Sequence, residues 1–79
     1  MSDADDLSEH EADTLAGLEE INREYAADFA TQLRAAGQPE HLVAAAVAEY
    51  EEMLAARLER AWPLMRRDMQ ISAGRARLQ

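Results

Sequence analysis

The chain of 79 residues contains no cysteine and no lysine, only four aromatic residues, and no long uninterrupted hydrophobic run. Without cysteine, no disulfide can reinforce the fold, and the composition is compatible with a reducing compartment. No stretch approaches the roughly 20 apolar residues that a membrane-spanning helix needs. The N-terminal residues are acidic, whereas a secretory signal would begin with basic and then hydrophobic residues. We therefore expect a cytoplasmic protein that does not associate with membranes.

Residues suited to catalysis or to cofactor binding are also scarce. The three glycines, Gly17, Gly37 and Gly74, are too far apart to form a phosphate-binding loop. There is no cysteine nucleophile, and Thr14 and Thr31 lie within helical patterns without a clear base partner. Two carboxylates that act as acid and base need a partly dry pocket to separate their pKa values, which two helices alone do not provide. The sequence thus favours a protein that is not an enzyme and that needs no cofactor.

Charge is unevenly distributed along the chain. The 16 acidic and eight basic residues give a net charge of −8, and every basic residue is arginine. Most acids precede residue 29, whereas most arginines follow residue 56. Because phosphate binding requires a concentrated positive surface, this balance disfavours direct contact with nucleic acid. The acidic N-terminal part instead suits a partner protein with a basic surface.

The same charge pattern favours a chain that folds back on itself, since its two ends then lie beside opposite charges. Each exposed ion pair contributes only a few tenths of a kcal/mol, so the pairs select an orientation more than they stabilise the fold. The alternative is two charged ends that are solvated independently. In a hairpin closed at residues 37–39, the expected neighbours are Arg57 and Arg60 with Asp13, Glu19 and Glu20, and Arg66 and Arg67 with Glu9 and Glu11.

The first half of the chain has the periodicity of an amphipathic helix. Ser8 and Glu11 have the spacing of a capping box, which predicts a helix that begins near Ser8. Asp13 is a competing cap that would start the helix one turn later. Residues 1–7 precede both caps and show no periodicity, so we expect a disordered acidic leader there. The predicted apolar stripe consists of Leu15, Leu18, Ile21 or Asn22, Tyr25, Phe29 and Leu33.

A second amphipathic helix follows a short turn. Gly37 suits the left-handed residue that ends a helix, and Pro39 suits the first turn of the next helix. So short a connection makes the two helices antiparallel neighbours. The predicted apolar stripe of the second helix consists of Val43, Val47, Tyr50, Leu54, Leu58, Ala61, Met65 and Met69.

Proline interrupts the second helical pattern. Pro63 lacks the N–H that an interior helical residue donates and crowds the preceding turn, so we expect a kink or a break at Trp62–Pro63. Residues 64–71 would then form a last short helical piece that ends at residues 72–74. The predicted organisation is a helical hairpin domain over residues 8–71, followed by a mobile basic tail over residues 72–79.

The predicted fold is all-α: an antiparallel helical hairpin with a kinked second helix. Much of the hydrophobic content is alanine, so a single hairpin would leave apolar surface exposed. A domain of this size usually needs a metal, disulfides or a partner to complete its core. We therefore expect a homodimer in which two hairpins form a four-helix bundle.

Two groups of residues are candidates for binding a partner protein with a basic or apolar surface. Methionine side chains adapt well to partner surfaces, and the alternative is that they pack the far end of a dimer core. The candidates on the second helix are Met53, Trp62, Pro63, Met65 and Met69. The acidic candidates on the first helix are Glu20, Glu24 and Asp28.

These patterns together predict a non-enzymatic interaction module: an adaptor, an inhibitor or antitoxin-like protein, or a small subunit of a complex. The competing hypothesis is an oligomer that holds a metal or a small ligand between protomers. Asn22 and Arg57 fall near the apolar stripes, where they would contact an anionic ligand. Glu24, Asp28, Glu49 and Glu52 would supply carboxylates for a metal across a dimer, although solvated helix faces explain them more simply.

Overall fold

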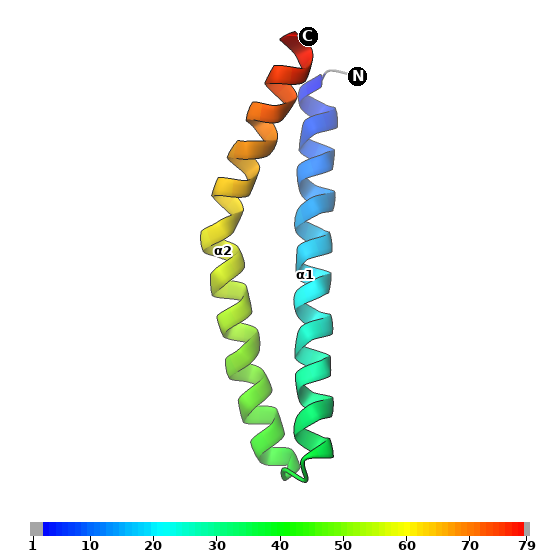
Figure 1. Ribbon diagram of the computed structural model, residues 1–79, viewed down its shortest axis with the longest axis vertical. Coiled ribbons are helices and arrows are strands. Elements are labelled where there is room, and N and C mark those ends of the chain that lie inside the picture. The colour runs from blue at the N-terminus through cyan, green and yellow to red at the C-terminus, as the bar shows by residue number, and fades with distance from the viewer. Residues whose placement is uncertain (1–2, 79) are drawn as a thin grey trace.

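A computed structural model describes the backbone of residues 3–78 and the side chains of residues 8–75. Within that part the chain forms two helices, α1 (Asp3–Ala35) and α2 (Glu40–Leu78), and no strand. The helices pack against each other in antiparallel orientation, with the turn at one end and both termini at the other (Figure 1). The predicted all-α helical hairpin is thus confirmed. Neither described helix is both long and apolar enough to cross a membrane.

Gly37 determines the shape of the turn. Its φ angle is 83°, a left-handed conformation that costs other residues roughly 1–2 kcal/mol. The Gly37 N–H donates to the carbonyl of Arg34 at 3.0 Å, and the Gln38 N–H donates to the carbonyl of Leu33 at 3.1 Å. These two bonds form a Schellman motif, which satisfies carbonyls that the helix end would otherwise leave unpaired. The predicted role of Gly37 is confirmed.

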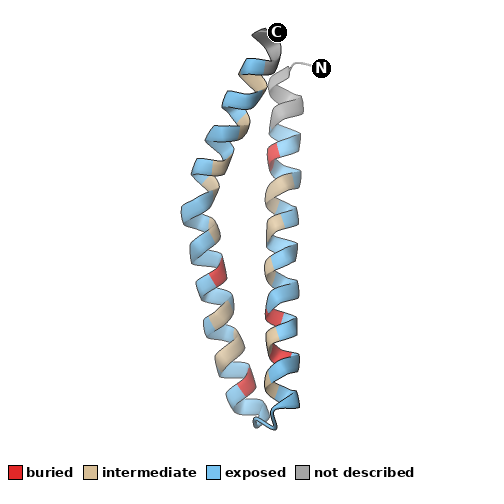
Figure 2. Ribbon diagram, in the orientation of Figure 1, coloured by how far each residue is buried: buried red, intermediate tan, exposed pale blue. Residues whose placement is uncertain are grey.

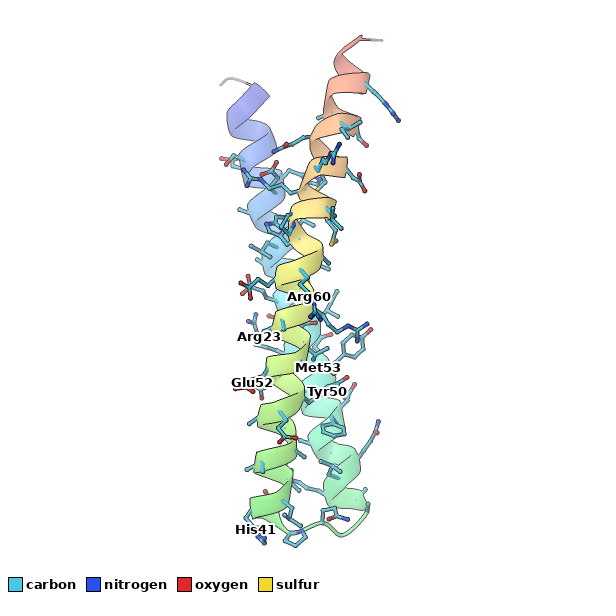
Figure 3. The ribbon with its side chains drawn as sticks, turned by 90° about the vertical axis from the view of Figure 1, so that its left-hand side faces the viewer. Arg23, His41, Tyr50, Glu52, Met53 and Arg60 are labelled. Atoms are coloured by element: carbon cyan, nitrogen blue, oxygen red, sulfur yellow. The ribbon has the colours of Figure 1, made fainter. Side chains whose placement is uncertain are left out.

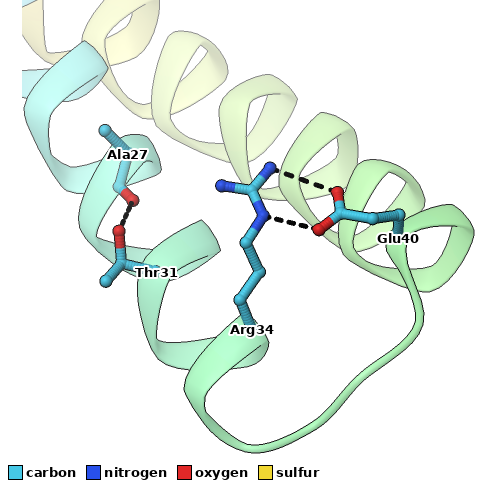
Figure 4. A network of polar contacts seen from close by, with 4 residues as sticks. All are labelled: Ala27, Thr31, Arg34 and Glu40. Carbon is cyan, nitrogen blue, oxygen red and sulfur yellow. Dashed lines mark hydrogen bonds and ion pairs between the residues drawn. The ribbon is translucent and has the colours of Figure 1, made fainter.

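The second helix begins directly after the turn. The Pro39 carbonyl accepts a hydrogen bond from the Val43 N–H at 3.0 Å, in agreement with its predicted place at the helix start. Across the turn, Nε and Nη2 of Arg34 donate to the two carboxylate oxygens of Glu40 at 2.8 and 3.3 Å (Figure 4). Both charges also interact favourably with the dipoles of their helix ends. This hydrogen bonding lowers the pKa of Glu40 and raises the pKa of Arg34.

The contact between the helices is narrow. Ala26, Ala30, Val43 and Leu54 are the buried apolar residues among those described, and most other residues are partly or fully exposed (Figure 2). Two of these four are alanines on α1, where a small side chain lets the second helix approach closely. The two helices therefore meet along a narrow line of buried residues and do not enclose a large hydrophobic core.

The predicted apolar stripes are wrong at two positions. Tyr25 is 54% exposed, and Ala26 occupies the inward position with 4% exposed. On α2, Ala61 is exposed and Trp62 is half-buried. Asn22 is the inward residue of the two alternatives on α1. The physical reason is the helix repeat: a straight helix faces nearly the same direction again after 11 residues. The next inward residue after Asn22 is therefore Ala26, whereas the prediction chose Tyr25.

Both helices are longer than predicted. α1 begins at Asp3, before the expected caps at Ser8 and Asp13, and α2 continues through residues 72–74 to Leu78. Extending a helix adds a hydrogen bond for each residue fixed, so weak start and stop signals need not end it. The side chains of residues 1–7 and 76–79 lie outside the described residues, and the disordered leader and mobile tail stay predictions.

Pro63 lies inside α2, which is a single helix through this point. The expected break into a separate piece over residues 64–71 is therefore wrong, while a local kink stays a prediction. Because proline has no N–H, the carbonyl of Glu59 receives no helical hydrogen bond from it. α2 as a whole bows away from α1 at mid-length and returns toward it near the termini (Figure 1).

The hairpin is elongated. Its principal extents are 56 × 21 × 17 Å and its radius of gyration is 17.6 Å, whereas a compact domain of this length would have a radius of gyration of roughly 12 Å. Its accessible surface is 6129 Å², compared with roughly 4,800 Å² for a compact monomer of this mass. The single chain thus exposes much more surface than a compact fold would.

Candidate protein-binding groove

A groove of about 610 Å³ runs between the two helices on one side of the hairpin. Its apolar floor comes from Leu15 on α1 and from Leu54, Leu58 and Trp62 on α2. The segment of α2 that lines the groove, residues 51–63, is the part where α2 bows away from α1 (Figure 1). The other lining residues are Glu19, Asn22, Arg23, Glu51, Ala55, Glu59 and Pro63.

Asn22 is an uncharged polar residue in the lining of the groove. Its Nδ2 donates to the backbone carbonyl of Leu54 at 3.5 Å, which is a long hydrogen bond. This hydrogen bond joins the two helices near their mid-length, among the apolar side chains that pack there. Since an unpaired amide would be costly in this half-buried position, Asn22 favours the register in which it lies opposite Leu54.

Carboxylates dominate the rim of the groove. Glu19 on α1 and Glu51 and Glu59 on α2 line it, together with Arg23. Nη2 of Arg23 donates to Glu20 at 2.6 Å, and both side chains are exposed. This hydrogen bond raises the pKa of Arg23, and the negative charge of Glu20 offsets the positive charge of Arg23. A molecule that enters the groove therefore meets an apolar floor and a net negative rim.

A polar cluster joins the helices beyond the groove, toward the termini. Glu11 accepts hydrogen bonds from Nε of Arg66 at 2.9 Å and from Nε2 of Gln70 at 3.2 Å. Only 11% of the Glu11 side chain is exposed. The predicted proximity of Arg66 and Glu11 is thus confirmed. No ion pair within the described side chains joins Arg57 or Arg60 to α1, and Arg60 points to the side of α2 away from the groove residue Arg23 (Figure 3).

The predicted binding residues on α2 are divided among three places. Trp62 and Pro63 line the groove. Met65 and Met69 are half-buried within the single hairpin. Met53 is 44% exposed and lies on the opposite edge of α2 (Figure 3). Only the first pair therefore belongs to the groove.

The acidic candidates on α1 lie outside the groove. Glu20, Glu24 and Asp28 are all exposed, and none of them is among the lining residues. Glu20 contributes indirectly through its ion pair with Arg23. Within a single chain, the described residues include no group of three or more His, Cys, Asp or Glu side chains placed to hold a metal ion.

Sequence reasoning missed the acidic rim. Glu51 and Glu59 were not among the predicted binding residues, although a signal for a groove edge was present. Glu51, Ala55 and Glu59 recur every four residues, directly beside the apolar residues Leu54 and Leu58. Four-residue spacing places the three on one face of a helix, and the alanine between the two acids leaves room for an entering side chain.

No family model matches the sequence, and neither the curated proteins nor the solved structures include a significant match to it. The chemistry of the groove and of the surfaces beside it is therefore the basis for assigning a function.

Proposed function

We propose that the protein is a non-enzymatic interaction module whose groove binds an amphipathic helix of another protein. The observation that carries the proposal is an apolar floor bordered by three carboxylates. A helix that docks in a groove inserts apolar residues at three- and four-residue spacing. The acidic rim would pair with arginine or lysine residues that flank those apolar positions, which agrees with the basic partner expected from the chain's net charge of −8.

The dimensions of the groove suit a short helical segment. Its floor on α2 extends from Leu54 to Trp62, and eight residues of helix correspond to about 12 Å. Two to three turns of a partner helix cover that length. Shorter occupants would leave part of the apolar floor in contact with water.

We also propose that the protein is a homodimer in which two hairpins form a four-helix bundle. The large surface of the single chain, 6129 Å², supports this. It exceeds the area expected for a compact monomer by roughly 1,300 Å², and a standard interface covers roughly 800 Å² per partner. A cytoplasmic location is part of the same proposal and agrees with the absence of cysteine.

Trp62 provides the test of groove binding, because it is the only tryptophan of the chain and lines the groove. The probe is a 15-residue helical peptide with leucines at three- and four-residue spacing, flanking arginines and no aromatic residue. We expect a saturable shift of Trp62 emission to shorter wavelength. A peptide with glutamate in place of arginine should bind about tenfold more weakly or worse, since it faces like charges.

Variants of the protein sharpen this test. Changing Glu51 and Glu59 to lysine should reverse the preference between the two peptides. The matched control is Glu24→Lys, which makes the same kind of charge change outside the groove and should leave the preference intact. Equal binding of both peptides, or no change of Trp62 emission with either, would refute the proposal.

A further inference from the structure

The hairpin has a second unusual surface on the edge opposite the groove. Large apolar side chains are exposed there, and we call this surface the apolar face. Its members are Ile21 and Tyr25 on α1, and Leu42, Met53 and Leu64 on α2, each between 44% and 65% exposed. A further exposed residue, Ile71 (42%), lies beyond Leu64 toward the C-terminal end of α2. Large apolar side chains that gather on one edge of a hairpin make that edge a candidate interaction surface.

Helix geometry shows that the members of α2 form one line. Leu42, Met53 and Leu64 are each 11 residues apart, and 11 residues make three turns plus about 20°. The groove residue Ala55 follows Met53 by two residues, which turns it about 200° away. In Figure 3, Met53 and Arg60 accordingly lie on one side of α2, with Arg23 and Glu52 on the other.

An aromatic contact connects this line to the exposed residues of α1. The rings of Phe29 and Tyr50 pack with their centroids 4.7 Å apart. Tyr25 precedes Phe29 by four residues and Met53 follows Tyr50 by three, and residues at these spacings are neighbours on a helix surface. Tyr25 and Met53 therefore lie on the same edge of the hairpin, beside the aromatic pair.

The apolar face is symmetric about a single point along the hairpin. Asn22 contacts Leu54 across the helix pair, so that position 23 of α1 lies level with position 53 of α2. Ile21 and Tyr25 are two residues on either side of position 23. Leu42 and Leu64 are 11 residues on either side of position 53, or about 16 Å along the helix axis. A two-fold axis through this point would exchange the members of each pair.

We infer that the apolar face packs against the same face of a second copy, about a two-fold axis perpendicular to the helices at Met53. This inference rests on the proposed homodimer and specifies its orientation. α2 then runs antiparallel to the partner's α2, with Met53 against the partner's Met53 and Leu42 against the partner's Leu64. The surface beside Leu42 fits this arrangement, since a hollow of about 310 Å³ lies there between Leu42, Ala45 and Ala46, and Leu64 is 65% exposed.

Charge supports the same orientation. Glu49 and Arg57 each lie four residues from Met53, on opposite sides of it along the chain. Neither forms an ion pair within the described part of its own chain. The two-fold axis brings Glu49 opposite the partner's Arg57, and does so twice in each dimer. The opposite orientation, with both turns at the same end, would instead set Leu42 and Leu64 against the polar residues Gln32 and Thr14 of the partner.

The antiparallel dimer leaves both grooves accessible, because they lie on the outer sides of the bundle. The module would then present two equivalent grooves pointing in opposite directions. A symmetric dimer of this kind can hold two partner molecules at once, or two segments of one partner with increased avidity.

Charge reversal tests the inference with variants that do not touch the contact line between the helices. Glu49→Arg sets arginine against the partner's Arg57, and Arg57→Glu sets glutamate against the partner's Glu49, so each variant alone should raise the dissociation constant of the dimer about tenfold. Mixing the two variants restores both pairs and should restore dimerisation. Sedimentation equilibrium measures this, and circular dichroism verifies that each variant is helical. A mixture that dimerises no better than the separate variants overturns the inference.

Cysteine cross-linking gives an independent measurement, since the chain has no cysteine of its own. We expect Met53→Cys to form a disulfide-linked dimer rapidly, and Leu42→Cys to link to Leu64→Cys only when the two are mixed. The control Glu51→Cys, on the groove side, should link no faster than in a monomer. Cross-linking of Met53→Cys to Tyr25→Cys but not to itself would show a dimer of the other orientation and overturn the inference. A monomeric mass would overturn the homodimer as well, while peptide binding at Trp62 would still test the groove separately.

Discussion

Replacing Arg66 should reveal how strongly the buried carboxylate of Glu11 couples the two helices. Arg66→Met removes one of the two donors to a side chain that is only 11% exposed. A largely buried charge that loses a donor costs roughly 1–3 kcal/mol. The expected loss of stability is smaller than the roughly 3–5 kcal/mol that breaking a fully buried ion pair costs, because the Arg66 side chain is 56% exposed and water can reach the site.

The matched control is Arg23→Met, which breaks the ion pair with Glu20. Both side chains of that pair are more than 60% exposed, and the pair lies within one helix, so its loss should destabilise the hairpin far less than the loss of Arg66. Urea denaturation measures the free energy of unfolding of both variants. The protein concentration is kept fixed, since dimerisation contributes to the apparent stability. The double variant Glu11→Leu with Arg66→Met should recover most of the loss, because no unpaired charge remains. Equal effects of Arg66→Met and Arg23→Met would refute the assigned role of Glu11.

Four further substitutions have expected outcomes. Pro63→Ala restores a hydrogen bond to the Glu59 carbonyl, so circular dichroism should show equal or higher helicity. If Pro63 kinks α2 and thereby shapes the groove, the same substitution should weaken binding of the arginine peptide. Unchanged binding would exclude that role of Pro63. Gly37→Ala should destabilise the hairpin by about 1 kcal/mol, because the φ angle of Gly37 is 83°. Gly17→Ala should instead stabilise α1 by up to about 1 kcal/mol, because no atom lies near the added methyl group. If urea denaturation showed that both substitutions change the free energy of unfolding in the same direction, this reasoning would be wrong. Arg34→Gln should return the lowered pKa of Glu40 toward its ordinary value in an NMR titration. Because a lowered carboxyl pKa contributes stability that disappears as pH falls through the folded pKa, the variant should also lose less stability on acidification.

The turn could be predicted because its determinants are local. Gly37 and Pro39 lie within three residues of each other, and each imposes a backbone geometry that is independent of the rest of the chain. The pairing of Glu11 with Arg66 was also predictable, since charge and distance from the turn are enough to place both at the same level. These features require only the sequence and the assumption of a hairpin.

The inward residues were harder to predict, because hydrophobicity and position compete. Tyr25 is the more apolar-looking choice by size, yet the straight helix turns position 26 inward and the alanine there permits close approach. The groove depends on the bow of α2 and on the register set near Asn22, which are properties of the packed pair. No single segment contains that information, so the four-residue spacing of Glu51 and Glu59 identifies a groove edge only once the packing of the two helices is known.

Two surfaces with different chemistry lie on opposite edges of this hairpin. The groove has an apolar floor and a negative rim, whereas the apolar face has large exposed side chains in a symmetric arrangement. Separate surfaces allow a protein of this size to dimerise and to bind a partner simultaneously. The proposed interaction module depends on that separation.

The most direct test of the central claim is the stoichiometry of the complex with the arginine peptide. Sedimentation velocity with a labelled peptide would measure the mass of the complex and the number of peptides in it. If the groove binds the helix while the apolar face holds the dimer, the complex contains two chains and two peptides, and peptide binding leaves the dimer intact. A peptide that separates the dimer into single chains would show that both processes use the same surface, and would contradict the claim.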